Sequence, residues 1–558
     1  MRVLGLNAIF HDPAAALVVD GRVVAAAEEE RFTRRKHGKR PVPFSAWELP
    51  EHAAAWCLAS AGLAPADLDA VAYSYDPALC QPAGSLGLND PWDHLRVTYA
   101  ARAPAFVADA LPGLDPAAVR FVGHHMAHAA SAGLAAPLGD ASVLVCDGRG
   151  EAASHLAGRY AGGRFEVLAS QRLPHSLGLF YEELTSHLGF RRSSDEYKVM
   201  ALASYGRPRF TAQISRLVHP DGSGGFRTEP VGWHSMVKRR QSGEPIGAEH
   251  ADLAASAQLV LENVLLDLVR WLHGQTGDTG LAMAGGVALN CVANSRLASE
   301  GPFDRIWVQP AAGDAGTALG GALAIAADAG EATLPMSDAY LGRGWTDAEL
   351  GAWLETAAWP YERPASIADA VAAELAEDRI VAWFTGRSEF GPRALGNRSL
   401  FAHPGRRANL DRLNAVKGRE EFRPVAPMVL ADAAAEIFTG PLPSPYMLFV
   451  HGVEPGWRDR IPAVVHVDQT ARVQTVDRAT QPLLAELLDG FAARTGLPVV
   501  INTSLNTAGR PMVDDPRDAL ECFGSAPVDV LALGPFLVRR PRLAAPLRTA
   551  GYNVRASA

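Results

Sequence analysis

Cysteine is scarce in this chain, and no pattern connects the few that occur. No two form a Cys-x-x-Cys pair, and the chain of 558 residues contains five: Cys57, Cys80, Cys146, Cys291 and Cys522. An odd number of scattered cysteines disfavours a disulfide framework. Residues 1–20 also lack the basic and then apolar segments of a secretory signal. We therefore expect free thiols and a cytoplasmic protein.

Long apolar runs and an excess of positive charge are missing too. No apolar run approaches the length of a membrane span. The net charge of −9 argues against a dedicated nucleic-acid surface, although local basic loops can still bind phosphates. We expect neither a membrane nor a nucleic acid as partner, and the sequence leaves the oligomeric state open. The length exceeds what one core accommodates and predicts two to four domains.

Two stretches of the sequence are typical of consecutive strands joined by tight turns. The first covers residues 2–28 and has Asp20-Gly21, a strong two-residue hairpin signal, between β-rich runs. The second covers residues 142–170, with turns at 147–150 and at Gly162-Gly163. Helical segments follow both stretches. This repetition predicts a duplicated α/β core around a central cleft.

The first chemical motif is the histidine-rich segment that begins after Gly123. If residues 124–137 are helical, His124 and His128 lie one turn apart and can bind one metal ion from the same face. The alternative is a polar helix start with unrelated histidines.

Two aspartates strengthen the metal hypothesis. Asp147 and Asp314 each end an apolar run, at 142–146 and 305–309, where the chain turns beside glycines. Carboxylates in such positions can reach a metal or a phosphate. Two imidazoles and two carboxylates suit Fe, Mn or Zn and leave open positions for a substrate oxygen.

A glycine pair follows the helix predicted at 251–272. The apolar strand that begins at Leu281 enters Gly285-Gly286 and then a helix near Asn290. Glycines there let a ligand approach the backbone, and a helix start offers free N–H groups to an anion. The alternative is a tight turn without a ligand. The position between the histidine pair and the turn at 313–316 favours a nucleotide site.

Periodicity is lost between residues 343 and 366, and we predict a domain boundary there. The first domain then covers residues 1–345 and the second residues 366–558. A helix at 367–376 and a strand at 380–384 are predicted to open the second domain.

The second domain concentrates basic residues in loops shaped by glycine and proline. They occur in the segments 386–399, 416–424 and 469–473, and include Arg393, Lys417, Arg419, Arg423 and Arg472. Within an acidic protein, such loops most simply form a pocket for phosphate-rich ligands. The alternative is a solvated basic face.

Seven motifs together resemble the carbamoyltransferase family of the NodU/CmcH type. They keep one order along nearly the whole chain: Leu4-Gly-Leu-Asn7 with His11-Asp12, Ala27-Glu-Glu-Glu-Arg-Phe-Thr33, His124-His-Met-Ala-His-Ala129, Glu196-Tyr-Lys-Val-Met200, Gly285-Gly-Val-Ala-Leu-Asn290, Gly391-Pro-Arg-Ala-Leu-Gly396 and Asn502-Thr-Ser-Leu-Asn506. The resemblance implies an α/β protein with an N-terminal duplicated domain of the ASKHA type, as in actin and sugar kinases. It implies a C-terminal YrdC-like domain that forms carbamoyl adenylate.

The resemblance also implies a two-step reaction. Carbamoyl phosphate and ATP, supplied with Mg, would give carbamoyl adenylate and pyrophosphate in the second domain. A hydroxyl acceptor would then attack this anhydride in the first domain, where a metal, Fe most readily, polarises it. The product would be an O-carbamate. Because water destroys the anhydride, we expect an enclosed path between the two sites.

The resemblance assigns roles to individual residues. The implied metal ligands are His124, His128, Asp147 and Asp314. His11 corresponds to the general base, a role that suits an imidazole near neutral pH. The residues implied to bind the adenylate and the phosphates are Gly285, Gly286, Asn290, Arg393, Lys417, Arg423, Arg472 and Asn502. The basic run 31–40 is predicted to be a surface loop; alternatively, Lys36 contacts the adenylate or the acceptor.

The sequence is compatible with three functions. The leading hypothesis is an ATP-dependent O-carbamoyltransferase acting on a specialised metabolite, such as an aminoglycoside, macrolide, β-lactam precursor or glycolipid. The second is a small-molecule kinase of the ASKHA fold, for which the histidine pair and the basic domain serve no evident purpose. The third is a non-catalytic nucleotide-binding regulator. The sequence does not identify the acceptor or the metal.

Overall fold

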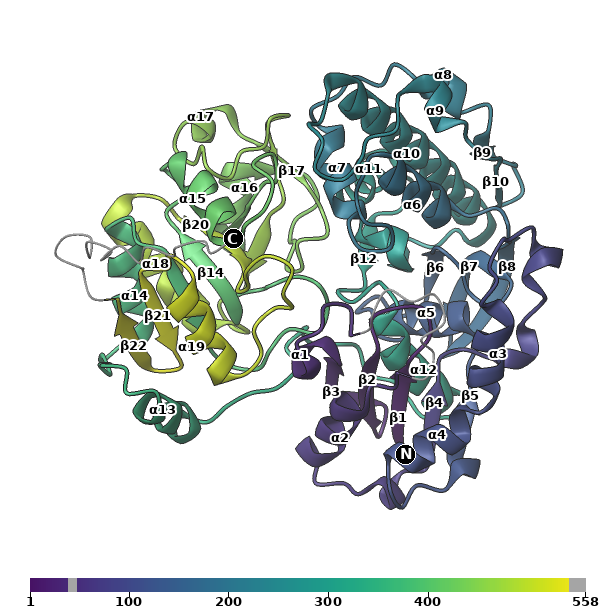
Figure 1. Ribbon diagram of the computed structural model, residues 1–558, viewed down its shortest axis with the longest axis horizontal. Coiled ribbons are helices and arrows are strands. Elements are labelled where there is room, and N and C mark those ends of the chain that lie inside the picture. Colours follow the sequence, from purple (N-terminus) through teal and green to yellow (C-terminus); the bar gives the residue numbers. More distant parts are fainter. Residues whose placement is uncertain (39–47, 541–558) are drawn as a thin grey trace, which may run out of the picture.

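The computed structural model describes residues 1–38 and 48–540. Two five-stranded sheets lie in the N-terminal part of the chain, and a seven-stranded sheet lies in the C-terminal part. Figure 1 shows the C-terminal part, in green and yellow, beside the N-terminal part, in purple, blue and teal.

The first sheet has the order β3-β2-β1-β4-β5. Its strands are β1 (Arg2–Asn7), β2 (Ala14–Val19), β3 (Arg22–Glu28), β4 (Ala70–Tyr73) and β5 (Val119–Phe121). The first three strands are antiparallel neighbours, and β4 and β5 continue the sheet in parallel from β1.

The second sheet repeats this topology with the order β12-β11-β6-β7-β8. Its strands are β6 (Ala141–Cys146), β7 (Ala153–Ala161), β8 (Arg164–Arg172), β11 (Gly280–Ala284) and β12 (Arg305–Val308). Again three antiparallel strands are followed by two strands parallel to the first. The predicted duplication is therefore confirmed, and it extends from the hairpins to the complete five-stranded units.

Two helices lie between the duplicated sheets. Helices α5 (His124–Gly133) and α12 (Ala315–Asp328) are lined by small apolar side chains and share one buried core with strands of both sheets. Their contact is close because Gly320 has no side chain: a Cβ there would lie 1.8 Å from the carbonyl oxygen of Ala127. Glycine is thus required for the two helices to approach each other.

Further helices complete the N-terminal part. They are α1 (Glu30–Thr33), α2 (Glu51–Ser60), α3 (Asp93–Ala101), α4 (Ala103–Ala110), α6 (Leu177–His187), α7 (Glu196–Ala203), α8 (Thr211–Ile214), α9 (Trp233–Met236), α10 (Ala248–Thr276) and α11 (Cys291–Glu300), with a short ribbon of β9 (Val218–Pro220) and β10 (Phe226–Thr228). The helix predicted at 251–272 is confirmed as part of α10, which ends at the left-handed Gly277. A glycine tolerates this conformation without the strain of a side chain.

The C-terminal sheet has the order β19-β15-β20-β14-β13-β21-β22. Its strands are β13 (Val381–Phe384), β14 (Arg398–Ala402), β15 (Ala426–Leu430), β19 (Gln474–Val476), β20 (Val499–Ser504), β21 (Val530–Leu533) and β22 (Phe536–Arg539). A second, small sheet joins β16 (Phe438–Thr439), β17 (His451–Val453) and β18 (Thr470–Ala471). The helices of this part are α13 (Asp347–Thr356), α14 (Ile367–Ala376), α15 (Ala408–Val416), α16 (Ala431–Ile437), α17 (Pro455–Arg458), α18 (Pro482–Thr495) and α19 (Pro516–Ser525).

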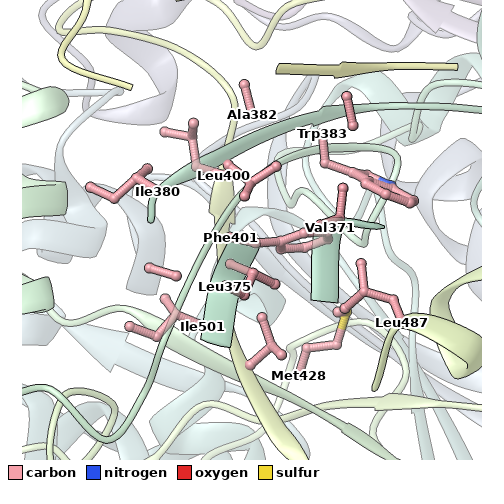
Figure 2. Close-up of a cluster of buried hydrophobic side chains, with 14 of the residues drawn as sticks. Val371, Leu375, Ile380, Ala382, Trp383, Leu400, Phe401, Met428, Leu487 and Ile501 are labelled. Carbon is pink, nitrogen blue, oxygen red and sulfur yellow. The ribbon is translucent and has the colours of Figure 1, made fainter. Parts of the chain in front are cut away.

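The C-terminal part has its own hydrophobic core. Figure 2 shows Val371 and Leu487, from α14 and α18, beside Phe401 and Ile501 from the sheet. The helix predicted at 367–376 is confirmed. Helix α13 lies within the segment where we placed the domain boundary, and its Leu350 and Leu354 are buried in this same core.

Two other expectations concern composition. All five cysteines are free thiols. Over the ranges 1–38 and 48–540, no helix combines the length and the apolar character needed to cross a membrane.

Candidate active site

The four predicted metal ligands converge at the centre of the N-terminal part. Residues 124–133 do form a helix, α5, and its turn spacing places His124 and His128 on one buried face. Asp147 directly follows β6. The sequence suggested that Asp314 lies at the end of a strand, but the structure differs. Strand β12 ends at Val308, and Asp314 directly precedes the first residue of α12. The close packing of α5 on α12 brings this carboxylate to the histidines.

The distances within this group suit a single metal ion. Nε2 of His124 lies 3.4 Å from Oδ2 of Asp147 and 3.7 Å from Oδ1 of Asp314. Nε2 of His128 lies 3.9 and 3.8 Å from the same two oxygens. Two donors about 2.1 Å from a tetrahedral ion are roughly 3.4 Å apart, so the group is close to the size that an ion requires.

The hydrogen-bonding state of the histidines supports the same interpretation. Among the described residues, Nε2 of His124 and Nε2 of His128 are buried without a hydrogen-bond partner. Buried polar atoms are normally satisfied, and an unpaired one calls for a ligand such as an ion. Two imidazoles and two carboxylates form the donor set that Fe, Mn or Zn accepts. The residues present therefore fit a metal.

Burial and the neighbouring charges shift the pKa values within this group of four residues. Burial raises the pKa of Asp147, but the nearby imidazoles of His124 and His125 outweigh it and hold that pKa well below its usual range. Burial lowers the pKa of His124, yet its contacts with Asp147 and Asp314 raise it well above the ordinary value. For His128 burial dominates, and its pKa is lowered. The carboxylates thus stay ionised and able to bind a cation.

His11 faces the same group from the turn between β1 and β2. Its Nε2 lies 3.8 Å from Oδ2 of Asp314, and its Nδ1 lies 2.9 Å from Oδ2 of Asp12. Burial lowers the pKa of His11, but Asp314 and Asp12 outweigh it and raise the pKa to about 10. Asp12 binds Nδ1, so Nε2 is the nitrogen that faces the metal group. At a pKa of about 10 His11 is protonated near neutral pH, and Nε2 becomes a base only when a cation bound by Asp314 opposes that charge.

Asp12 connects His11 to a second histidine that the sequence analysis did not single out. Its other carboxylate oxygen lies 2.9 Å from Nδ1 of His37, whose Nε2 lies 2.8 Å from the hydroxyl of Ser194. Asp12 and His37 both have positive φ, at 51° and 63°. Such backbone is uncommon outside glycine and is often found at functional sites. The His11-Asp12 dipeptide was the available signal, but no spacing rule links it to residue 37.

The predicted glycine loop lies against the metal group. The backbone N–H of Gly286 donates to Oδ1 of Asp147 at 2.9 Å, and Gly285 donates to the carbonyl of Ala312 at 2.8 Å. Asn290 caps α11 and exchanges hydrogen bonds with Gln258. The amide of Asn290 thus orients the loop.

The opposite end of this loop reaches the C-terminal part. Cys291, the first residue of α11, lies near Arg472, whose pKa its thiol raises. Arg472 in turn lies near Arg393 and Arg423, since each alters the pKa of its neighbours. Residues 285–291 therefore connect the metal group to the predicted phosphate-binding residues.

The structure brings the predicted basic residues together into a cluster, which we call the basic cluster. Its members are Arg393, Lys417, Arg419, Arg423 and Arg472, and Arg419 was noted in the sequence without a role. Across the part of the chain that is described, only Arg423 of these five forms an ion pair with a carboxylate, at 3.5 Å from Glu420. Buried Nε atoms of Arg393 and Arg472 have no hydrogen-bond partner there either.

Mutual repulsion shows in the pKa values of this cluster. Burial and the neighbouring Arg472 lower the pKa of Arg393 to about 9. Burial, Arg419 and Arg423 hold the pKa of Lys417 well below its usual range. Concentrated cations without matching carboxylates are unfavourable unless an anion joins them. The basic cluster is therefore suited to bind phosphate groups.

Lys417 and Asn502 both form hydrogen bonds within the C-terminal part. The ammonium of Lys417 donates to the carbonyl and hydroxyl oxygens of Ser504, at 2.5 and 2.9 Å. The amide nitrogen of Asn502 donates to Gln474 at 2.6 Å, while its buried Oδ1 has no partner among the described residues. A polar group of a ligand can therefore be bound by Asn502.

The prediction of a surface loop at 31–40 is wrong for its first three residues, which belong to helix α1, and Arg31 is not on the surface. Arg31 is 3% exposed and forms an ion pair with Glu28 inside the protein. Lys36 lies nearer the predicted site: its Nζ is 6.0 Å from the ring centre of Tyr197, and its charge lowers the pKa of Lys417. Lys39 and Arg40 lie outside the described residues.

Tyr197 is another residue whose role the sequence analysis did not recognise. The Arg423 guanidinium stacks 4.7 Å from its ring centre, and the adjacent Lys198 pairs with Glu420 at 2.9 Å. Helix α7 thereby carries an aromatic ring from the N-terminal part into the basic cluster. The signal was present in the motif at 196–200, but the sequence does not show that this helix faces the second domain.

Comparison with known proteins gives consistent matches along the chain. The family model described as the carbamoyltransferase N-terminus matches residues 2–81 and 98–323. The model described as the carbamoyltransferase C-terminus matches residues 372–540.

Related sequences match most of the chain. An uncharacterized protein of Synechocystis is 36% identical, with 96% of each chain covered. The nodulation protein NolNO of Sinorhizobium fredii is 37% identical and covers 97% of this chain and 80% of its own. Nodulation protein U of Rhizobium tropici is 31% identical, with 93% of each covered.

Solved structures are more distant. HypF of T. kodakarensis has a TM-score of 0.39 and 15% identity, covering 60% of this chain and 48% of its own. A ROK hexokinase of Thermus thermophilus has a TM-score of 0.28 and 13% identity, covering 58% of this chain and 98% of its own. With both family models matched in order over most of its length, the chain belongs to the carbamoyltransferase family.

Proposed function

We propose that this carbamoyltransferase is an ATP-dependent O-carbamoyltransferase with carbamoyl adenylate as its intermediate. In the second domain one water would cleave carbamoyl phosphate to carbamate and orthophosphate. The carbamate oxygen would then attack the α-phosphate of MgATP at the basic cluster, which gives carbamoyl adenylate and releases pyrophosphate. The N-terminal site would transfer the carbamoyl group to a hydroxyl of a specialised metabolite and release AMP. We further propose a YrdC-like fold for the second domain, 366–558, and an ASKHA-type fold for residues 1–345.

One observation carries the proposal: the loop 285–291 lies between the two candidate sites. Gly286 donates to Asp147 of the metal group, and Cys291 lies near Arg472 of the basic cluster. A reactive anhydride needs a short path shielded from water. One loop joins the phosphate-binding cluster to the metal group and would provide such a path. A simple kinase requires no second cationic domain.

The roles of the residues follow from their positions. Arg393, Arg423 and Arg472 would neutralise phosphate charge that otherwise opposes the approach of the two anionic substrates. The backbone of Gly285 and Gly286 would lie along the adenylate. A divalent metal, Fe in our proposal, would be bound by His124, His128, Asp147 and Asp314 and would supply Lewis-acid polarisation of the carbonyl.

His11 would take the proton of the acceptor. Asp12 binds Nδ1 and leaves Nε2 directed toward the metal group, where the acceptor hydroxyl has to lie. General-base catalysis by a positioned imidazole contributes about 10²–10⁴-fold. The proton accepted at Nε2 leaves the acceptor oxygen free to attack the carbonyl carbon.

The products distinguish this proposal from the alternatives. The protein is incubated with carbamoyl phosphate, MgATP and a panel of alcohols, and each alcohol is examined by mass spectrometry for an added carbamoyl group. AMP and pyrophosphate support the transferase. ADP would indicate a kinase, and no turnover would indicate a regulator; either result would refute the proposal.

A substitution locates the first step. Arg423→Ala should abolish carbamoyl phosphate-dependent exchange of pyrophosphate into ATP, whereas chemically supplied carbamoyl adenylate should still give product. Arg406→Ala, at an exposed position of the same domain, is the matched control. Normal exchange by Arg423→Ala would show that the basic cluster does not bind these substrates.

A further inference from the structure

One loop of the C-terminal domain packs into the hydrophobic core of the N-terminal domain. It connects β13 to β14, and its Phe390 is 1% exposed and buried in the core that α5 and α12 share with the N-terminal sheets. The backbone N–H of Phe390 also donates to the carbonyl of Ala339 at 2.8 Å. The side chain and the backbone of Phe390 therefore both anchor this loop.

The next residue, Gly391, is bound on both of its backbone polar groups by side chains of the first domain. Its N–H donates to Oε1 of Glu28 at 2.7 Å, and its carbonyl accepts from Nη2 of Arg31 at 2.9 Å. Glu28 and Arg31 also pair with each other, with Nε 3.3 Å from Oε2. Both are buried, at 6% and 3% exposure.

The backbone of Gly391 is confined by its own conformation and by its neighbours. Its φ is 113°, a value that L side chains rarely adopt. A Cβ there would lie 2.7 Å from the carbonyl oxygen of Pro310. Gly391 is therefore enclosed between the Glu28–Arg31 pair and the segment that leads to Asp314.

Arg393 follows Gly391 by two residues and belongs to the basic cluster. The rest of the loop is organised by Glu389, whose Oε1 accepts hydrogen bonds from the backbone N–H groups of Leu395, Asn397 and Arg398. A loop bound at both ends moves as a unit. The position of Gly391 consequently determines where the guanidinium of Arg393 lies.

We propose that Glu28 and Arg31 are positioning residues of the adenylate-forming site, acting from the other domain. Through Gly391 they place Arg393 on the anionic substrates, so that the first step of the reaction depends on residues of the domain that performs the second. This inference rests on the proposed function. It also gives a chemical role to the Glu-Glu-Glu-Arg segment at 28–31.

The test compares two adjacent buried glutamates. Glu28→Ala removes the acceptor for Gly391, whereas Glu29→Ala removes a carboxylate of 3% exposure that binds His52 and the N–H of Ala53 inside the first domain. We expect Glu28→Ala to lower kcat/KM for carbamoyl phosphate in the pyrophosphate exchange about 10- to 100-fold, the range for losing a hydrogen bond to a charged group. The loss should appear in KM. Glu29→Ala should stay within about threefold of the wild type.

Three further measurements separate positioning from general damage. Transfer from supplied carbamoyl adenylate and metal content should be unchanged in Glu28→Ala. Glu28→Gln keeps an acceptor for the N–H of Gly391 and should restore most of the exchange. Arg31→Met provides a second variant and should reproduce the loss if Glu28→Ala does not fold. Equal exchange by folded Glu28→Ala and Glu29→Ala, or no restoration by Glu28→Gln, would overturn the inference.

Hydrogen–deuterium exchange distinguishes failure of this inference from failure of the proposed function. The peptide that contains Gly391 should take up deuterium faster in Glu28→Ala than in Glu29→Ala, whatever the reaction is. Unchanged uptake overturns the positioning role. If the wild type shows no pyrophosphate exchange but uptake rises as expected, the proposed function is refuted while the contact between Glu28 and Gly391 is supported.

Discussion

The buried arginines of the basic cluster make a quantitative prediction possible. Burial and the repulsion of Arg472 lower the pKa of Arg393 from 12.5 to about 9. One pKa unit corresponds to about 1.4 kcal/mol, so the charged side chain costs the folded protein up to about 5 kcal/mol relative to an exposed arginine. Because pH 7 lies below both pKa values, the whole cost is present at neutral pH.

Arg393→Met removes this charge and keeps an apolar stem of similar length. Replacing buried charges by apolar side chains commonly stabilises a protein by about 1–4 kcal/mol. We expect the ligand-free variant to melt about 2–16 °C higher than the wild type, since 1 kcal/mol corresponds to about 2–4 °C for a domain of this size. The same change should remove an anion ligand and weaken pyrophosphate binding.

Scanning calorimetry without and with pyrophosphate tests both effects. The wild type should gain about 2.7 kcal/mol at pyrophosphate concentrations 100-fold above its Kd, and Arg393→Met should gain much less. Arg406→Met, at an exposed position, should change neither property. Arg472→Met should also stabilise, and the double variant should gain less than the sum, because each arginine raises the cost of the other.

The opposite pattern would refute the reasoning. If Arg393→Met melts lower than the wild type and is stabilised by pyrophosphate to the same extent, Arg393 is a structural residue and its burial serves folding. The basic cluster would then not be an anion site.

Three further predictions concern the N-terminal site. His128→Ala should lose the bound metal in elemental analysis and lose carbamoyl transfer, while pyrophosphate exchange continues; loss of both activities in a folded variant would contradict separate sites. His11→Asn should slow transfer about 10²–10⁴-fold in a mass-spectrometric assay, and near-normal transfer would remove His11 from the mechanism. Burial and Glu182 raise the pKa of Glu196 from 4.5 to about 7. The folded state therefore binds this proton more tightly than the unfolded state, and the stability that it contributes below about pH 4.5 is lost as the pH rises through 7. Relative to Glu196→Gln, the wild type should lose up to about 3 kcal/mol between pH 4.5 and 7.5 in chemical denaturation, and parallel pH profiles would contradict this.

The sequence by itself determined the local elements and the family. Asp20-Gly21 and Gly162-Gly163 specify tight turns through their own backbone preferences, so both antiparallel units could be predicted. The spacing of His124 and His128 predicts a shared helical face for the same reason, since helix geometry is local. The order of seven motifs predicted the carbamoyltransferase family, which the comparisons confirm.

Only the tertiary structure decided which of these residues meet. Asp314 reaches the histidines because α12 packs closely on α5 at Gly320, a contact between residues almost 200 positions apart. Arg31 sits in a basic run whose composition favours solvent, yet it is buried because the carbonyl of Gly391, 360 positions away, adds a partner to the neighbouring Glu28. The pKa values of the basic cluster arise likewise from burial and from neighbours brought together by folding. Local pattern specifies helices, strands and turns, whereas burial and charge pairing depend on long-range contacts that no sequence spacing encodes.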